Sequence, residues 1–352
     1  MRDKLLKACR ILIPAYLKAR IRARPIWAHF YVTRRCNLKC SYCFVREEHK
    51  PDIETDKAVN VIDKLHSLGC RLVAFLGGEP TMRSDLSLLI AHASKHKMIT
   101  HVSTNGTLLT RSYLSVLCDS GLDVLNLSVD SISATLHSRK DLEQNMTIFD
   151  NILLARQERG LDVNVNCVLT RRNADKVVAI VDRMTDLKIP ISIGYIIKNT
   201  YSDKLQDPAL FFTTEEERNL LFSTLATLKR MKKEGYSIIE PARYFDDVEK
   251  FARGNSSWYC AAGLYYLSVD CDGRLMMCGS LPAEEQSIMD IDRNYFKTFR
   301  NRWQAHLQRC KPRCISNCVY DTSFFIQHPL KFFAGELRNH TRPKARVFAP
   351  IR

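Results

Sequence analysis

The chain has 352 residues, of which 45% are hydrophobic and 26% are charged, values that are ordinary for a soluble globular protein and exclude wholesale disorder. With only 13 Gly and 12 Pro, collagen-like and low-complexity proteins are excluded as well. No apolar run approaches the roughly 18 residues of a membrane-spanning helix. No cleavable signal peptide is evident, so the sequence predicts a cytoplasmic protein.

The formal charge of +15 is distributed unevenly along the chain. Residues 1–24 carry eight Lys or Arg and one acid, residues 331–352 carry six and one, and everything between is nearly neutral. Basic ends suit an anionic surface, either a membrane or a nucleic acid. The alternative is that they only solubilise the protein.

The amino-terminal segment, residues 1–24, has the pattern of a basic amphipathic helix. Its apolar residues repeat at helical spacing and most of its basic residues fall elsewhere around the helix; the apolar set is Leu5, Cys9, Leu12, Ile13 and Tyr16. Such a helix can lie on an anionic membrane, as a peripheral contact, or dock against the body of the protein. The sequence leaves both alternatives open.

From residue 25 to about residue 200, short β-rich runs alternate with stretches of helical period. The expected strands lie at 26–32, 72–76, 100–104, 124–129, 163–169 and 191–197, and helical patterns occur at 58–68, 86–93, 148–155 and 174–184. This alternation indicates β-α units around a parallel sheet. Six units predict an α/β fold, a partial (β/α)6 TIM-like barrel, with its chemistry at the carboxyl ends of the strands.

Three further segments follow the barrel. Residues 201–254 are expected to form a helical connection, in which Thr214 and Glu217 make a capping box and Gly235 ends the helix. Residues 255–325 contain the late cysteines and are expected to form a smaller, loop-rich domain. Residues 326–352 form a basic tail with aromatic residues nearby, a mixture that also suits stacking on RNA, although we rank a membrane surface above nucleic acid.

Thirteen cysteines are many for a chain without a secretory signal, and clustered cysteines then point to metal or redox chemistry. Cys36, Cys40 and Cys43 follow the first predicted strand in one short loop. Three thiolates can ligate three irons of a four-iron cluster and leave the fourth iron open. Zinc, the structural alternative, prefers four protein ligands and finds only three here.

The sequence here resembles the radical SAM superfamily, whose signature is C-x3-C-x2-C after the first strand with an aromatic residue, Tyr42, before the last cysteine. Further matches end the next four strands: Gly77-Gly78-Glu79-Pro80, Ser103-Thr104-Asn105-Gly106, Leu127-Ser128-Val129-Asp130 and Asn166-Cys167-Val168-Leu169-Thr170. The resemblance covers residues 26–197 in order.

This resemblance implies cofactor-binding roles at the strand ends. Gly77 and Gly78 would let the backbone approach a ligand closely. Glu79 would accept hydrogen bonds from the methionine ammonium of S-adenosylmethionine, and Ser128 and Asp130 would accept them from its ribose. The remaining candidates for contact with cofactor or substrate are Thr104, Asn105, Asn166 and, weakly, Ile196.

The resemblance also implies the chemistry. The three early cysteines hold a [4Fe–4S] cluster, S-adenosylmethionine chelates the open iron, and one electron from a donor such as flavodoxin or ferredoxin cleaves it to a 5′-deoxyadenosyl radical. That radical removes a hydrogen atom from the substrate.

The late cysteines resemble a SPASM or twitch extension. Cys260, then Gly273 and Cys278, match the opening of that pattern, with Asp272-Gly273 as a hairpin turn. Cys310, Cys314 and Cys318 follow, with fewer cysteines than a full SPASM domain. We expect one auxiliary [4Fe–4S] cluster on Cys260, Cys278 and two or three of the last set, with zinc as the alternative, and we expect Cys271 to be a strand residue.

The predicted function is therefore a radical SAM enzyme that acts on an unidentified substrate, for which the basic ends favour a membrane-associated or lipid-linked molecule. A peptide or small metabolite is the alternative substrate within the same superfamily. A non-enzymatic iron–sulfur redox or scaffold protein is the alternative from a different class.

Overall fold

The computed structural model describes residues 2–341, except 48–50, 136–137, 144–145, 199–205, 257, 282 and 311–313. The strands are β1 (Trp27–Thr33), β2 (Leu72–Gly77), β3 (Ile99–Thr104), β4 (Val124–Ser128), β5 (Asp162–Leu169), β6 (Ile191–Tyr195), β7 (Tyr266–Val269) and β8 (Leu275–Met276). The helices are α1 (Arg2–Arg22), α2 (Thr55–Leu68), α3 (Leu86–Lys95), α4 (Arg111–Asp119), α5 (Met146–Arg159), α6 (Val177–Asp186), α7 (Glu215–Glu234), α8 (Ala242–Ala252), α9 (Arg293–Cys310), α10 (Asn317–Gln327) and α11 (Pro329–Thr341). Short 3-10 turns occupy Pro80–Met82, Pro208–Leu210 and Ile288–Asp290.

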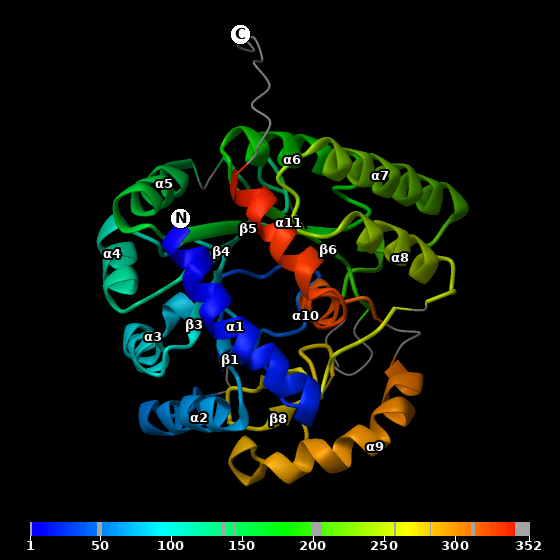
Figure 1. The fold of residues 1–352 in the computed structure, drawn as a ribbon. Coiled ribbons are helices and arrows are strands. Elements are labelled where there is room, and N and C mark those ends of the chain that lie inside the picture. Colours follow the sequence, from blue (N-terminus) through cyan, green and yellow to red (C-terminus); the bar gives the residue numbers. More distant parts are fainter. Residues whose placement is uncertain are drawn as a thin grey trace.

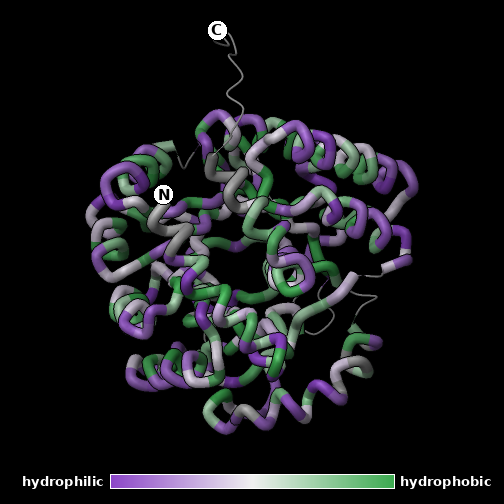
Figure 2. Tube along the Cα trace, viewed as in Figure 1, coloured by the Kyte–Doolittle hydropathy of each residue, from purple (hydrophilic) through white to green (hydrophobic). Residues whose placement is uncertain are grey.

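The strands form one curved sheet in the order β6-β5-β4-β3-β2-β1-β7-β8, and the first six are parallel (Figure 1). Helices α2 to α6 lie outside this sheet, as in a β/α barrel (Figure 1). Alternate strand residues such as Phe30, Phe75 and Val102 face these helices and are fully buried. Hydrophobic residues accordingly concentrate on the strands and the inner helix faces (Figure 2). The predicted α/β fold and six-unit barrel are confirmed.

The sheet also extends beyond its first strand, because β7 pairs in parallel with β1, in the register Trp27↔Tyr266 to Phe30↔Val269. Strand β8 then pairs antiparallel with β7, and the connecting turn contains Gly273 at a φ of 78°. The predicted hairpin is confirmed. Cys271, expected in a strand, lies in this turn instead, because β7 ends at Val269.

The region expected to be loop-rich, residues 255–325, is more helical than predicted. It contains α9, of 18 residues, and α10, of 11. The sequence analysis did not predict α9, because few of the residues in this helix are apolar. Its aromatic residues Tyr295, Phe299 and Trp303 nevertheless recur at spacings of four and pack against the core.

The helical connection was predicted closely. The Thr214 hydroxyl accepts a hydrogen bond from the Glu217 amide at 3.2 Å, and the Glu217 carboxylate accepts one from the Thr214 amide at 3.0 Å, so the capping box opens α7. Gly235 ends the helix in the left-handed conformation, with φ at 94°. Helix α7 and helix α8 then pack on each other beside β6 (Figure 1).

Helix α1 crosses one open end of the barrel and lies beside α10 and α11 (Figure 1). Leu12 and Ala19 are buried in a cluster with Leu72 and Ala74 of β2, at the amino-terminal end of the strands. Tyr16 packs edge-on against Phe325 of α10, with ring centroids 5.5 Å apart. The face of α1 that carries Leu12, Tyr16 and Ala19 therefore docks against the body of the protein, which is one of the two alternatives for this segment. No helix within the described ranges is both long enough and apolar enough to span a membrane.

Candidate active site

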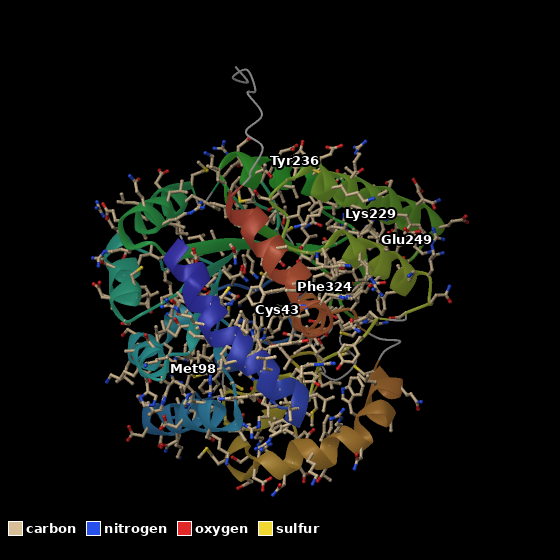
Figure 3. All side chains as sticks on the ribbon, viewed as in Figure 1. Cys43, Met98, Lys229, Tyr236, Glu249 and Phe324 are labelled. Atoms are coloured by element: carbon tan, nitrogen blue, oxygen red, sulfur yellow. The ribbon has the colours of Figure 1, made fainter. Side chains whose placement is uncertain are left out.

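The loop that carries the first three cysteines leaves β1 at the opposite end of the barrel from α1. Cys36, Cys40 and Cys43 are all half-buried. The Cys43 amide donates a hydrogen bond to the Cys40 carbonyl at 3.0 Å, and the Leu38 amide donates one to Cys36 Sγ at 3.4 Å. Figure 3 places Cys43 near the axis of the barrel, whereas Lys229 and Glu249 lie on the outer helices α7 and α8.

The glycine pair at the end of β2 packs against the start of this loop. A Cβ on Gly77, whose φ is +149°, would lie 2.0 Å from the Thr33 carbonyl oxygen, and one on Gly78 would lie 2.1 Å from that of Arg35. The Gly78 amide donates to Thr33 O at 2.8 Å. The glycines therefore allow a close approach, but the partner in the structure is the backbone that leads into the cysteine loop, and their predicted approach to a ligand stays a prediction.

Glu79 is buried and joins the ends of two strands. Its carboxylate accepts hydrogen bonds from the hydroxyls of Thr81 and Thr104, both at 2.6 Å, and from the Asn105 amide at 2.7 Å. The Asn105 side chain in turn donates to Asn37 Oδ1 at 2.8 Å, inside the cysteine loop. Three of the predicted residues thus come together and hold the loop in place.

Asp130 anchors the loop from the other side. Its Oδ2 accepts hydrogen bonds from the Tyr42 hydroxyl at 2.6 Å and from the Ser138 hydroxyl at 2.8 Å, and its Oδ1 accepts one from the Val168 amide at 3.0 Å. The resemblance implied a ribose ligand for this carboxylate, but here it serves protein donors. Burial, then the Asp130 charge, raises the pKa of Tyr42, so its hydroxyl remains a donor.

Sequence reasoning missed Lys140, which reaches the same place from the segment after β4. Its ammonium donates to the Tyr42 hydroxyl at 3.0 Å. Burial acts to lower the pKa of Lys140, but the Asp130 carboxylate and then the thiolate forms of Cys40, Cys43 and Cys36 raise it. A single lysine between two strand motifs carries no signal in a sequence. The structure makes it the positive charge beside the three thiols.

The inner face of the barrel is polar toward β4, β5 and β6. Ser128 pairs with Asn166, and Asn166 with Ser192, so their side chains share one face of the sheet. The side-chain amide of Asn317, at the start of α10, donates to Ser192 Oγ at 3.0 Å and to Asn166 Oδ1 at 3.3 Å. Ile196, just past β6, is buried. Nothing in the sequence singled out Ser192 or Asn317, because only the fold brings α10 into the barrel.

The late cysteines form a second group. Cys260, Cys278 and Cys314 are buried, whereas Cys310 and Cys318 are half-buried. Burial, followed by Cys278, Cys260 and Cys310, raises the pKa of Cys314, so these three cysteines lie within electrostatic reach of Cys314. Burial and then Asp321 raise the pKa of Cys318 to about 12. Burial, and then Cys318, raises the pKa of Tyr31, whose hydroxyl lies against Gly279.

Both groups of cysteines have donor sets that fit iron–sulfur clusters. Burial raises the pKa of Cys36 and of Cys40, so at neutral pH these thiols stay protonated until iron replaces the proton. Three thiols suit a cluster with one open iron. Four thiols suit either a fully ligated cluster or zinc.

The family model described as "Radical SAM superfamily" matches residues 30–204, which is the region that holds β1 to β6 and the first cysteine loop. The chain belongs to the radical SAM superfamily. It is 31% identical over 209 residues to an Fe-coproporphyrin III synthase of Methanosarcina barkeri, covering 58% of this chain and 52% of that protein. It is 33% identical over 168 residues to a PqqA peptide cyclase of Bradyrhizobium diazoefficiens, covering 46% and 44%. These matches span about half the length of either relative.

Solved structures extend the likeness beyond the barrel. The structure titled "Native anSMEcpe with bound AdoMet" superposes with a TM-score of 0.57 at 17% identity, covering 89% of this chain and 100% of that one. SuiB of Streptococcus suis, bound to S-adenosylmethionine, gives a TM-score of 0.57 at 19% identity, with coverages of 82% and 68%. The fold of this radical SAM protein therefore resembles theirs over most of its length.

Proposed function

We propose that this protein reductively cleaves S-adenosylmethionine and uses the resulting 5′-deoxyadenosyl radical to remove a hydrogen atom from a substrate inside the barrel. The observation that carries this proposal is the convergence of strand-end residues on the cysteine loop: Glu79 through Asn105 from one side, and Asp130 through Tyr42 from the other. A four-iron cluster on Cys36, Cys40 and Cys43 would supply the electron for the cleavage.

The residues of this chain would position the reactants and keep water away. Tyr42 and Lys140 fix the last cysteines of the loop and place a positive charge beside them. The polar inner face of Ser128, Asn166 and Ser192 offers hydrogen-bonding groups to cofactor and substrate. Helices α1 and α10 cover the far end of the barrel, so ligands would enter from the side of the cysteine loop.

The proposed auxiliary cluster uses Cys314 and the three cysteines that raise its pKa after burial, Cys278, Cys260 and Cys310. Cys318, predicted as a further candidate, remains one. Such a cluster would relay electrons or hold the substrate, and zinc remains the alternative occupant.

Cleavage of S-adenosylmethionine by the anaerobically reconstituted, reduced protein tests the proposal. Wild-type protein should release methionine and 5′-deoxyadenosine. The variant Cys36→Ala/Cys40→Ala/Cys43→Ala should release none and should lose one cluster's worth of iron. The buried Cys70→Ala on the outer layer is the matched control and should retain cleavage. Undiminished cleavage by the triple variant would contradict the assignment, and no cleavage by wild type would favour the redox or scaffold alternative.

For the substrate we propose a membrane-associated or lipid-linked molecule. Helix α1 docks one face on the barrel, yet a second apolar line, Ile13, Leu17 and Ile21, is 44%, 57% and 77% exposed. Exposed basic residues flank this line, among them Lys18 and Arg20. Anionic lipid would attract the charges, and the apolar line would add buried area. The peptide or small-metabolite alternative is supported by relatives named for a peptide and for Fe-coproporphyrin III.

Co-sedimentation with lipid vesicles tests whether the protein binds a membrane surface, as the lipid proposal requires. Deletion of residues 1–24 would also uncover the end of the barrel, so the sharper variant is Ile13→Ser/Leu17→Ser/Ile21→Ser, which leaves the docked face intact. Wild-type protein should bind phosphatidylglycerol vesicles at low salt, and the triple variant should bind at least about threefold less. Leu88→Ser, an exposed apolar residue on α3, is the matched control. Equal binding by wild type and triple variant would contradict the lipid proposal.

A further inference from the structure

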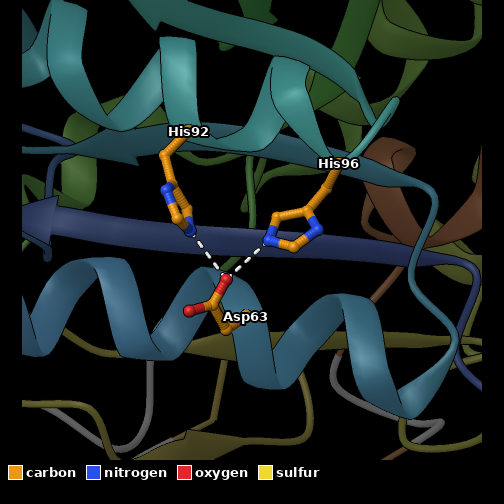
Figure 4. A group of neighbouring side chains, drawn as sticks. All are labelled: Asp63, His92 and His96. Carbon is orange, nitrogen blue, oxygen red and sulfur yellow. Dashed lines mark hydrogen bonds and ion pairs between the residues drawn. The ribbon is translucent and has the colours of Figure 1, made fainter.

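A cluster of one carboxylate and two imidazoles lies on the outer layer of the barrel, away from both groups of cysteines. Asp63 projects from α2, and His92 and His96 project from the carboxyl end of α3 (Figure 4). Each imidazole Nε2 lies 2.6 Å from the same atom, Asp63 Oδ1. The three ligand atoms lie within 4.8 Å of one another.

The spacing along α3 explains the convergence. His92 and His96 are four residues apart, so they lie on one face of the helix and both point toward α2. Their rings are nearly perpendicular, at 77°, and approach the carboxylate from two sides (Figure 4). His66, three residues after Asp63, stacks on the His96 ring at 4.6 Å and limits its rotation.

The three side chains are accessible from solvent, with exposed fractions of 46% for Asp63, 26% for His92 and 32% for His96. Half-exposed ion pairs contribute little to stability, so ion pairing alone gives no reason for two imidazoles to share one oxygen. Two imidazole nitrogens and one carboxylate oxygen on a common centre are, in contrast, a familiar donor set for zinc and related transition metals.

We propose that Asp63, His92 and His96 bind a divalent transition metal ion of the zinc class, with water completing the coordination. Ligand atoms around a tetrahedral zinc lie about 3.3 Å apart, given metal–ligand bonds of roughly 2.0–2.2 Å. The present contacts at 2.6 Å therefore need to open by about 0.7 Å, which half-exposed side chains on two helix surfaces can do. The metal takes the place of the proton that each Nε2 now donates, and that proton leaves to solvent or resides on Nδ1.

Such a metal would clamp two neighbouring helices of the outer layer. Helix α2 is the first helix after the cysteine loop along the chain, and α3 is the first α-helix after the Gly77–Pro80 segment. Near their amino ends the two helices are already joined, because the Thr55 hydroxyl donates to Asp85 Oδ2 at 2.6 Å. The metal would join them a second time, farther along, without touching the proposed S-adenosylmethionine site.

Zinc content measured on the full-length, cluster-loaded protein tests this proposal. After equilibrium dialysis against Zn²⁺, zinc and iron are counted in the same sample by mass spectrometry, so that exchange of zinc for iron registers as iron loss. Wild-type protein should hold one zinc per chain more than His92→Gln/His96→Gln at equal iron content. Lys95→Ala, an exposed residue on the same helix, should match wild type.

Cleavage of S-adenosylmethionine should be unchanged in the double variant, and zinc should raise the unfolding temperature of wild type but not of the variant. If the double variant loses iron, the single variant Asp63→Asn takes its place in the same comparison of zinc content, because it removes only the charged ligand. Equal zinc content in wild type and in the variant that retains its iron would overturn the proposal.

Discussion

The two groups of cysteines differ most in their exposure. The early loop leaves Cys36, Cys40 and Cys43 all half-buried, whereas three of the five cysteines in the late group, Cys260, Cys278 and Cys314, are buried. A catalytic metal centre keeps an open position for its ligand, and a structural or relay centre is closed by protein ligands. The difference in exposure therefore supports a division of labour: chemistry at the early loop, and a closed centre at the late group.

The two groups are also held by different forces. Polar side chains hold the early loop, through Tyr42 on Asp130 and Asn105 on Asn37. Packing dominates at the late group, because Trp258, Cys260 and Cys278 are buried in the hydrophobic core, where the Trp258 ring N–H also donates to the Cys314 carbonyl at 3.1 Å. A site that admits a polar ligand needs polar walls, whereas a closed centre is better excluded from water.

The largest effect that we expect from a change in one of the two cysteine groups is on the iron content. Cys278→Ala should lose about half of the iron, because it removes one ligand of the late group, and should keep at least about half of the S-adenosylmethionine cleavage, because the early loop is intact. Iron and sulfide analysis beside a cleavage assay measures both. Cys271→Ala, in the neighbouring turn, should keep all of its iron. Complete loss of cleavage in Cys278→Ala with the early cluster present would break the division of labour.

The next effect concerns the polar support of the early loop. Tyr42→Phe removes the hydrogen bond to Asp130 and the acceptor for Lys140, and one such bond to a charged group is worth about 1.5–3 kcal/mol. Cleavage should therefore fall roughly tenfold or more, with iron content preserved. Tyr236→Phe, after α7 and far from Cys43 in Figure 3, is the control. A Tyr42→Phe protein with wild-type cleavage would show that the cysteine loop keeps its conformation without the hydrogen bonds of the Tyr42 hydroxyl.

A third effect tests the link between the two regions, where β1 pairs with β7. The Tyr266 hydroxyl and His29 Nδ1 lie 2.7 Å apart across that pair. Burial, then His101, lowers the pKa of His29 to about 3, and burial lowers that of His101 to about 4. The unfolded chain binds these protons near pH 6.5 and the folded chain does not. Stability should therefore decline as the pH falls from about 6.5 toward 4.

Thermal unfolding of the cluster-loaded protein at pH 5, 6 and 7 measures this decline. His29→Gln/His101→Gln should show a shallower dependence on pH than wild type, because the two groups no longer take up protons on unfolding. The half-buried His328→Gln should retain the wild-type slope. An unchanged slope in the double variant would place the acid sensitivity in carboxylates instead.

Much of the barrel was predictable because local signals there agree. Alternation of apolar runs located β1 to β6 within one or two residues, and the capping box and Gly235 marked both ends of α7. The pairing of β7 with β1 was not predictable, because parallel pairing of distant segments leaves no mark in either sequence. The same applies to α1, whose apolar stripe suits a membrane and a barrel equally well.

The site was predictable as a set of positions but less so as a set of contacts. Glu79, Thr104 and Asn105, which the strand-end motifs singled out, hydrogen-bond to one another in the structure, whereas their predicted contacts with a cofactor stay predictions. Lys140 and Asn317 were missed, because each is a single polar residue whose role depends on where the chain returns in space. The histidine cluster on α2 and α3 carried a visible i, i+4 signal in His92 and His96, but its carboxylate comes from another helix.

The smallest effect provides a baseline outside both cysteine regions, in helix α7. Thr214→Ala should lower the free energy of unfolding by about 1 kcal/mol, as the loss of a threonine cap does elsewhere, while iron content and cleavage stay at wild-type values.

Hydrogen bonds from the Thr214 and Thr213 amides lower the pKa of Glu217 to about 2. This carboxylate therefore stabilises the fold above pH 4.5, its ordinary value, and loses that contribution as the pH falls toward 2. Glu217→Gln should accordingly be less stable than wild type at pH 7 and approach it in acid. Denaturant unfolding at the two pH values measures the convergence, and a difference that grew in acid would contradict the proposed role of the carboxylate.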